Sequence, residues 1–196
     1  MKKLLIFCSI ILVLAAVIPI IPTASDREIY QKTVRLHVLA ASDSDTDQAL
    51  KLEVRDAVLD TLAPILEDVT ERDAAVELIC SREEEIKNAA LEVIKECGRD
   101  DEIALSFSEE YYPRREYEGV TLPAGTYLSL RVMIGKAQGK NWWCVLFPTL
   151  CTSSAEPKEK LAQAGFTTGQ IKLITDTDST RYKLKFKLLE LFEEWF

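Results

Sequence analysis

Four stretches of the chain have the apolar pattern of β-strands, and they constrain the fold more than any other feature of the sequence. Residues 33–40, 103–108 and 127–134 alternate apolar side chains with other ones, whereas residues 141–147 are apolar on both faces. The last three stretches follow one another with no helical stretch between them. Such an order favours neighbouring strands that run in opposite directions. The sequence therefore predicts an antiparallel sheet of about four strands.

Helical periodicity is concentrated between the first of these strands and the second. Apolar residues form one stripe at helical spacing in residues 46–65, and a short helix is expected in residues 70–80. The sequence Ser81-Arg82-Glu83-Glu84 is a capping-box pattern, which predicts the start of a third helix that ends at Gly98. Helices and strands thus occupy separate parts of the sequence. The expected fold class is α+β, in which the antiparallel sheet is packed with helices.

The connections and the C-terminal part carry weaker patterns. Residues 135–139 have Gly at each end, which predicts a hairpin loop, whereas residues 111–125 predict an irregular excursion because they contain Pro and Gly and are too long for a tight turn. Short helices are expected in residues 158–164 and from about residue 168. Residues 181–196 place apolar side chains on one helical stripe, which predicts a C-terminal amphipathic helix.

The N-terminus has the parts of an export signal. Two lysines precede an uncharged run in residues 4–21, and small residues follow it. The run reaches the length at which a helix spans a membrane, so residues 1–25 are interpreted as a signal peptide or, if uncleaved, as an N-terminal membrane anchor. Residues 26–196, which begin with a polar lead-in, then form a single exported domain. Residues 4–21 would be its contact with the membrane if they are retained.

Length and charge narrow the class of function. A chain of 196 residues is long enough for one domain with its own core. Its net charge of −8 argues against a nucleic-acid partner, because phosphates are neutralised by Lys and Arg. The same acidic balance argues against a domain that charge alone holds on anionic lipid.

The cysteines are interpreted in the light of export. Cys8 lies within the apolar run, which leaves Cys80, Cys97, Cys144 and Cys151 in a compartment that permits disulfides. No pair has C-x-x-C spacing, so zinc-ribbon and thioredoxin-like sites have no support. Cys144 and Cys151 are close enough in sequence to form a disulfide, and a reactive thiol pair or two buried thiols are the alternatives. Cys97 lies on the apolar stripe of its helix, where a buried residue is expected.

Few groups in the sequence suit catalysis. The alternation of residues 33–40 predicts a half-buried strand that carries His37, the only histidine, beside Arg35 on its polar face. A catalytic His needs a nucleophile or an acid beside it, and the acidic loop of residues 43–47 is one conjectural source. That loop resembles half of a calcium site but lacks the required Gly and Glu, so helix capping is the expected role. We expect no metal, no cofactor and no enzyme activity, with an exported hydrolase that uses His37 as the alternative.

Aromatic residues point to a binding module. Tyr111, Tyr112 and Tyr117 lie in or next to the expected excursion, and aromatic side chains are frequent anchors of protein interfaces. Trp142 and Trp143 are adjacent on an expected strand, so they must point to opposite faces of the sheet. At most one of them belongs to the core of a two-layer fold, unless both faces are covered.

Three segments of the chain resemble the stage II sporulation protein R family of endospore-forming Firmicutes. They are "VRLHVLAASDSDTDQALKLEVRDAVL" (residues 34–59), "YYPRREYEGVTLPAGTYLSLRVMIG" (residues 111–135) and "GKNWWCVLFPTLC" (residues 139–151), in the order of the family and after an export signal. The resemblance implies a sporulation signal that is exported from the forespore into the space between the forespore and mother-cell membranes. There such a protein triggers a membrane-embedded aspartic protease of the mother cell, which removes the pro-sequence of sigma-E.

The resemblance also implies where a partner would bind. The family is not known for a catalytic site of its own, so no catalytic residues carry over to this chain. The matching segments contain the candidate partner surface, although several of their residues must serve the fold. The candidates are Arg35, His37, Asp43, Tyr112, Asn141, Trp142 and Trp143.

Overall fold

The computed structural model describes residues 3, 6, 7, 9, 13, 23–117, 119–150 and 157–175. Its elements are α2 (Ala24–Gln31), β1 (Val34–Leu39), α3 (Asp45–Leu66), α4 (Arg72–Ser81), α5 (Glu83–Glu96), β2 (Ile103–Tyr112), β3 (Arg115–Tyr117), β4 (Val120–Leu122), β5 (Gly125–Ile134), β6 (Asn141–Phe147), α6 (Pro157–Gln163) and α7 (Thr168–Thr175). No helix among these residues is both long and apolar enough to cross a membrane. The predicted signal or anchor in residues 4–21 lies almost wholly outside them, and the predicted helix in residues 181–196 lies entirely outside them.

The principal sheet has four strands in the order β2-β5-β1-β6, which confirms the α+β class and the expected number of strands. β2 pairs antiparallel with β5, and β1 pairs antiparallel with β6. β1 and β5, however, run parallel, with Leu36 opposite Leu130. The prediction of an antiparallel sheet is therefore wrong for this pair. The helices carry the chain from β1 to the far edge of the sheet, and β5 then returns between β2 and β1 in the direction of β1.

β1 is a central strand whose residues are all buried. The prediction of a half-buried strand is wrong, because helices cover one of its faces and side chains from β2, β3, β5 and β6 cover the other. The expected hairpin at residues 135–139 is also wrong, since β1 separates β5 from β6. The loop instead crosses the end of β1, where the Gly139 amide donates to the Ala40 carbonyl at 2.9 Å.

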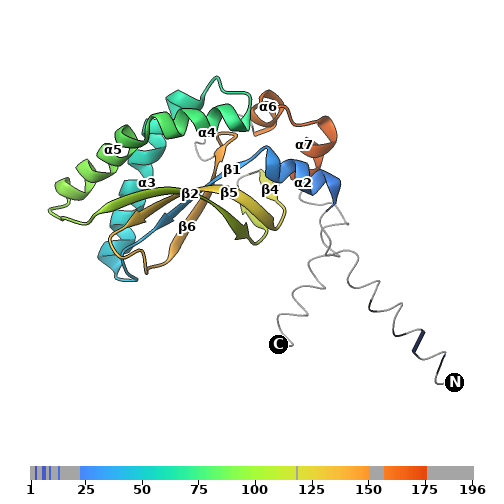
Figure 1. Cartoon of the computed structure of the whole chain (residues 1–196), viewed down its shortest axis with the longest axis horizontal. Coiled ribbons are helices and arrows are strands. Elements are labelled where there is room, and N and C mark those ends of the chain that lie inside the picture. The colour runs from blue at the N-terminus through green and yellow to red at the C-terminus, as the bar shows by residue number, and fades with distance from the viewer. Residues whose placement is uncertain are drawn as a thin grey trace.

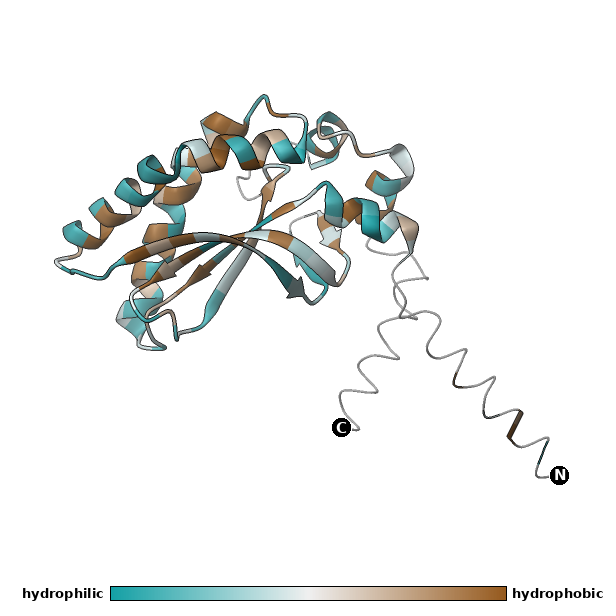
Figure 2. Cartoon of the chain, viewed as in Figure 1, coloured by the Kyte–Doolittle hydropathy of each residue, from teal (hydrophilic) through white to brown (hydrophobic). Residues whose placement is uncertain are grey.

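Helices α3, α4 and α5 lie on one face of the sheet, and α2, α6 and α7 gather near one end of it (Figure 1). α3 begins where the Ser44 hydroxyl accepts from the Asp47 amide at 3.2 Å, and the acidic first turn suits the helix dipole. Hydrophilic and hydrophobic residues alternate along α5, as in a helix with one apolar face (Figure 2). That face buries Ile86, Ala90 and Ile94 in the common core.

The predicted capping box at Ser81 does not form. Ser81 is the last residue of α4, and its hydroxyl donates back to the Leu78 carbonyl at 2.7 Å, so it is not free to cap α5. A capping box forms instead at the start of α2, between Thr23 and Asp26. The expected polar lead-in is therefore a helix. Gly98 ends the helical layer with a φ of 69°, as predicted.

Residues 111–125 are more regular than expected. β2 continues to Tyr112, β3 and β4 form a separate two-stranded hairpin, and β5 begins at Gly125. The prediction of an irregular excursion is wrong because strands of three residues are too short to give a periodic signal. Gly125 is required by close packing, since a Cβ at this position would lie 2.3 Å from Cζ of Tyr30 on α2.

Candidate interaction surface on the sheet

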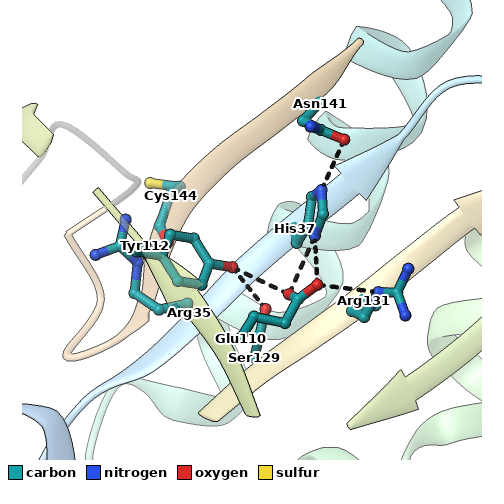
Figure 3. Close-up of polar contacts among 8 residues, drawn as sticks. All are labelled: Arg35, His37, Glu110, Tyr112, Ser129, Arg131, Asn141 and Cys144. Carbon is teal, nitrogen blue, oxygen red and sulfur yellow. Dashed lines mark hydrogen bonds and ion pairs between the residues drawn. The ribbon is translucent and has the colours of Figure 1, made fainter. Parts of the chain in front are cut away.

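The face of the sheet turned away from α3 and α5 carries polar and aromatic side chains. Alternation along each strand places them opposite the apolar residues that face the helices. We call this group the open-face cluster; its members are Arg35 and His37 of β1, Glu110 and Tyr112 of β2, Ser129 and Arg131 of β5, and Asn141 and Trp143 of β6. Most of them are drawn in Figure 3, where His37, Tyr112 and Arg131 reach Glu110.

Glu110 is the centre of the polar contacts. His37 Nδ1 lies 3.0 Å from both carboxylate oxygens of Glu110, and Arg131 Nε lies 3.3 Å from one of them. His37 Nε2 lies 2.9 Å from Asn141 Oδ1 on the far side of the ring. Glu110 and Asn141 thus hold the imidazole from both sides, and three strands are joined through one carboxylate (Figure 3).

Arg35 is a fully buried cation with an unusual environment. Its Nε donates to the Cys144 carbonyl at 3.0 Å, and its Nη2 donates to the Tyr117 hydroxyl. The guanidinium carbon lies 4.2 Å from the ring centroid of Tyr112 and 5.1 Å from that of Tyr127. No described carboxylate pairs with Arg35, and its Nη1 has no hydrogen-bond partner. Aromatic faces and a carbonyl therefore take the place of a counter-ion.

The tyrosines around Arg35 are held by hydrogen bonds and stay neutral. The Tyr112 hydroxyl lies 2.7 Å from Ser129 Oγ, and the Tyr127 hydroxyl donates to the Pro123 carbonyl at 2.6 Å. Burial raises the pKa of Tyr112 and of Tyr127 above the ordinary value for tyrosine. Tyrosinate therefore does not balance the charge of Arg35 near neutral pH.

Trp142 and Trp143 point to opposite faces, which confirms the prediction from their adjacent positions. Trp142 lies on the helical side, where the guanidinium carbon of Arg55 is 4.9 Å from its ring. Trp143 lies on the open face, 5.6 Å from the His37 ring and 4.5 Å from the guanidinium carbon of Arg115. Both indoles are half-buried, so neither belongs wholly to the core.

The acidic side chains before and at the start of α3 hold the preceding loop in place. Asp43 accepts from the Lys140 amide at 2.7 Å, and Asp47 accepts from the Ser42 hydroxyl and pairs with Arg99 at 2.6 Å. The Ser42 hydrogen bond, with Arg99, holds the pKa of Asp47 below its usual range. In the part of the chain that the structure describes, no three His, Cys, Asp or Glu side chains gather as metal ligands.

The seven candidates for a partner surface divide by exposure. Arg35 and Tyr112 are fully buried, and His37 is only 7% exposed. These three buried side chains therefore lie below the accessible surface and support it. Asp43 and Asn141 are exposed, and Trp142 and Trp143 are half-buried. The accessible candidates stay a prediction for contact with a partner, with Asn141 and Trp143 adjoining on the open face.

The cysteines fall into two groups. Cys144 is buried and disulfide-bonded, and Cys151 lies outside the described residues, so the pairing of these two stays a prediction. Cys80 and Cys97 are free and exposed. The expectation that Cys97 is buried is wrong, because it follows the last turn of α5, where the apolar stripe has left the core. Its thiol donates to Glu53 at 3.1 Å, which raises the pKa of Cys97.

The geometry around His37 bears on the hydrolase alternative. The acid beside His37 is Glu110 and not the loop of residues 43–47, so that conjecture is wrong. The second ring nitrogen is held by Asn141, and no described hydroxyl or thiol bonds to the ring. Ser129, a hydroxyl on the same face, bonds to Tyr112 instead. In this conformation both ring nitrogens of His37 are engaged, by Glu110 and by Asn141.

Sequence reasoning missed Glu110, Ser129 and Arg115 as parts of this surface. The alternation noted in residues 103–108 continues to Tyr112, and extending it would have placed Glu110 on the polar face with His37. The position of Arg115 over Trp143 had no such signal, since it depends on how the β3–β4 hairpin folds back.

The region of the chain that is similar to known proteins includes this surface. A family model described as Stage II sporulation protein R (spore_II_R) matches residues 30–157, which include all strands of the structure, α3 to α5 and the open-face cluster. The stage II sporulation protein R of Bacillus subtilis (strain 168) is 39% identical over 120 residues, 61% of this chain and 54% of that protein. The match thus spans about half the length of that relative, and no solved structure matches. The chain belongs to the stage II sporulation protein R family.

Proposed function

We propose that this chain is an exported sporulation signal that activates a membrane-embedded aspartic protease of the mother cell, and thereby leads to processing of pro-sigma-E. Membership of the stage II sporulation protein R family is the observation that carries the proposal. The open-face cluster supports it, since its buried members fix one another and leave Asn141 and Trp143 accessible. A half-buried indole on a fixed base is a common anchor of protein interfaces.

The proposed site of action is the space between the forespore and mother-cell membranes. The signal-like pattern of residues 1–25 supports export. The disulfide at Cys144 supports it independently, because disulfides persist in oxidising, extracytoplasmic compartments. In this proposal the extracytoplasmic part of the protease meets the open face.

A co-expression experiment tests the proposal. The chain, the protease and pro-sigma-E are produced together in a host that does not sporulate, and cleavage is followed by immunoblot. We expect processing that depends on the chain. Trp143→Ala should reduce it at least tenfold, whereas Trp142→Ala, a matched loss on the other face, should reduce it less than threefold. Both variants must be shown to be folded by circular dichroism. No processing with all partners correctly inserted would refute the proposed function.

The hydrolase alternative has one observation in its favour, the His37–Glu110 contact at 3.0 Å. The hydrogen bond from the other ring nitrogen to Asn141 counts against it. Replacing His37 by Gln separates the two functions. A hydrolase would lose its activity altogether, whereas a binding signal would retain processing in proportion to the folded fraction of the variant.

A further inference from the structure

A second surface, separate from the open face, lies along the edge of the sheet. β2 is the outer strand of the sheet and is ten residues long. No described strand pairs with its outer edge. The free N–H and C=O groups of such an edge pair readily with another extended chain, and natural proteins use long edges for this purpose or protect them.

A groove runs beside this edge on the helical side. It encloses about 60 Å³ and is lined by Ile79 and Cys80 of α4, Glu83 and Ile86 of α5, and Leu105 and Phe107 of β2. Leu105 and Phe107 are only half-buried, although they belong to the face that packs on the helices. A strand added to β2 would project every second side chain toward this groove. The mostly apolar lining suits an apolar side chain.

The charges at the rim of the groove indicate which charged residue a bound segment would carry beside its apolar side chain. Glu83 lines the groove at the first turn of α5, which also contains Glu84 and Glu85. Glu109 follows Phe107 on the same face of β2 and is exposed, and Tyr111, two residues further, is 72% exposed. The row along β2 is therefore apolar, apolar, acidic and aromatic. Lys or Arg opposite Glu109 complements it, whereas an acidic residue there is repelled.

We propose that the edge of β2 and the adjoining groove bind an extended segment of a partner protein, with apolar side chains opposite Leu105 and Phe107 and Lys or Arg opposite Glu109. The backbone of the segment continues the sheet, and its side chains give specificity. A second copy of this chain fits less well, because the net charge of −8 opposes association of the acidic edge with itself. The proposal is tested on the isolated chain, so its failure leaves the protease assignment untouched.

Cys80 provides the measurement, since its free, exposed thiol lines the groove. The full-length chain is titrated to millimolar concentration with the blocked peptide SVSLSKS, and the alkylation rates of Cys80 and Cys97 are followed by mass spectrometry. We expect Cys80 to react at least threefold more slowly while Cys97, remote from the groove, keeps its rate. The peptide SVSLSES, in which the charge is reversed, and the peptide SVSSSKS, in which Leu is replaced by Ser, should protect Cys80 less than 1.5-fold.

A charge exchange makes the test specific. In Glu109→Lys the preference should reverse, so that SVSLSES protects Cys80 and SVSLSKS does not. Asp60→Lys, an equal change on the exposed side of α3, should behave as the unaltered chain. Equal protection by all peptides, no protection, or an unreversed preference in Glu109→Lys would overturn the proposal. Protection of Cys80 in the absence of peptide would also overturn the proposal. If this protection rises with protein concentration, a second copy of the chain occupies the groove; if it does not, a segment of the same chain occupies it.

Discussion

Glu110 joins three strands of the sheet, and its removal should weaken the fold in a way that depends on His37. The informative perturbation is a double-mutant cycle of Glu110→Ala, His37→Ala and the double variant. The cycle isolates the energy of the His37–Glu110 contact from the effects that each substitution has on its other neighbours.

The geometry of the His37–Glu110 contact sets the expected size of the coupling energy. Both carboxylate oxygens lie 3.0 Å from Nδ1, and the side chains are 8% exposed for His37 and 22% for Glu110. A hydrogen bond to a charged group contributes about 1.5–3 kcal/mol, and partial exposure places this one near the lower end. We expect a coupling energy of about 1.5 kcal/mol. Glu110→Ala alone should cost about 2–3 kcal/mol, because Arg131 loses its partner as well.

Urea unfolding followed by tryptophan fluorescence measures these energies, and Trp143 reports from 5.6 Å away from the His37 ring. Glu109→Ala, an exposed neighbour on the other face of β2, serves as the control and should change the free energy of unfolding by less than about 0.5 kcal/mol. A coupling energy below about 0.5 kcal/mol would refute the view that Glu110 fixes His37.

Three further substitutions have expected outcomes. Gly125→Ala should lower the free energy of unfolding by about 1–3 kcal/mol in urea titrations, because its Cβ would meet Tyr30 at 2.3 Å. Arg35→Lys should cost about 2–3 kcal/mol and lower Tm, since an ammonium cannot replace the forked hydrogen bonds. The lowered pKa of Asp47 implies stability that is present above about pH 4 and lost on acidification, so Asp47→Asn should flatten the decline in unfolding free energy below that pH.

The helical part of the fold could be predicted from local patterns. The stripes of α3 and α5 and the positive φ of Gly98 depend on residues close in sequence, so periodicity and glycine chemistry reveal them. Ser81 shows the limit of such patterns. Its hydroxyl can either cap α5 or donate to the Leu78 carbonyl, which is equally close in sequence, and it does the latter.

The sheet topology and the open-face cluster could be predicted only in part. The parallel pairing of β1 with β5 depends on the path that the helices between β1 and β2 take to the edge of the sheet. The apolar pattern of the strands contains no information about that path. His37 and Glu110 are 73 residues apart, so their contact follows from that topology. Periodicity nevertheless placed Arg35 and His37 on one face and Trp142 and Trp143 on opposite faces correctly, because alternation along a strand is a local property.

Dose dependence tests most directly whether the chain acts as a signal by binding. Purified chain is added in increasing amounts to membranes that contain a known amount of the protease and pro-sigma-E, and the initial rate of cleavage is measured. If the chain activates by binding, the rate should rise with the amount of chain and level off once the protease sites are filled. A full rate at a hundredth of the protease concentration would indicate catalytic turnover by the chain, and no cleavage at any dose would exclude activation; either result would refute activation by stoichiometric binding.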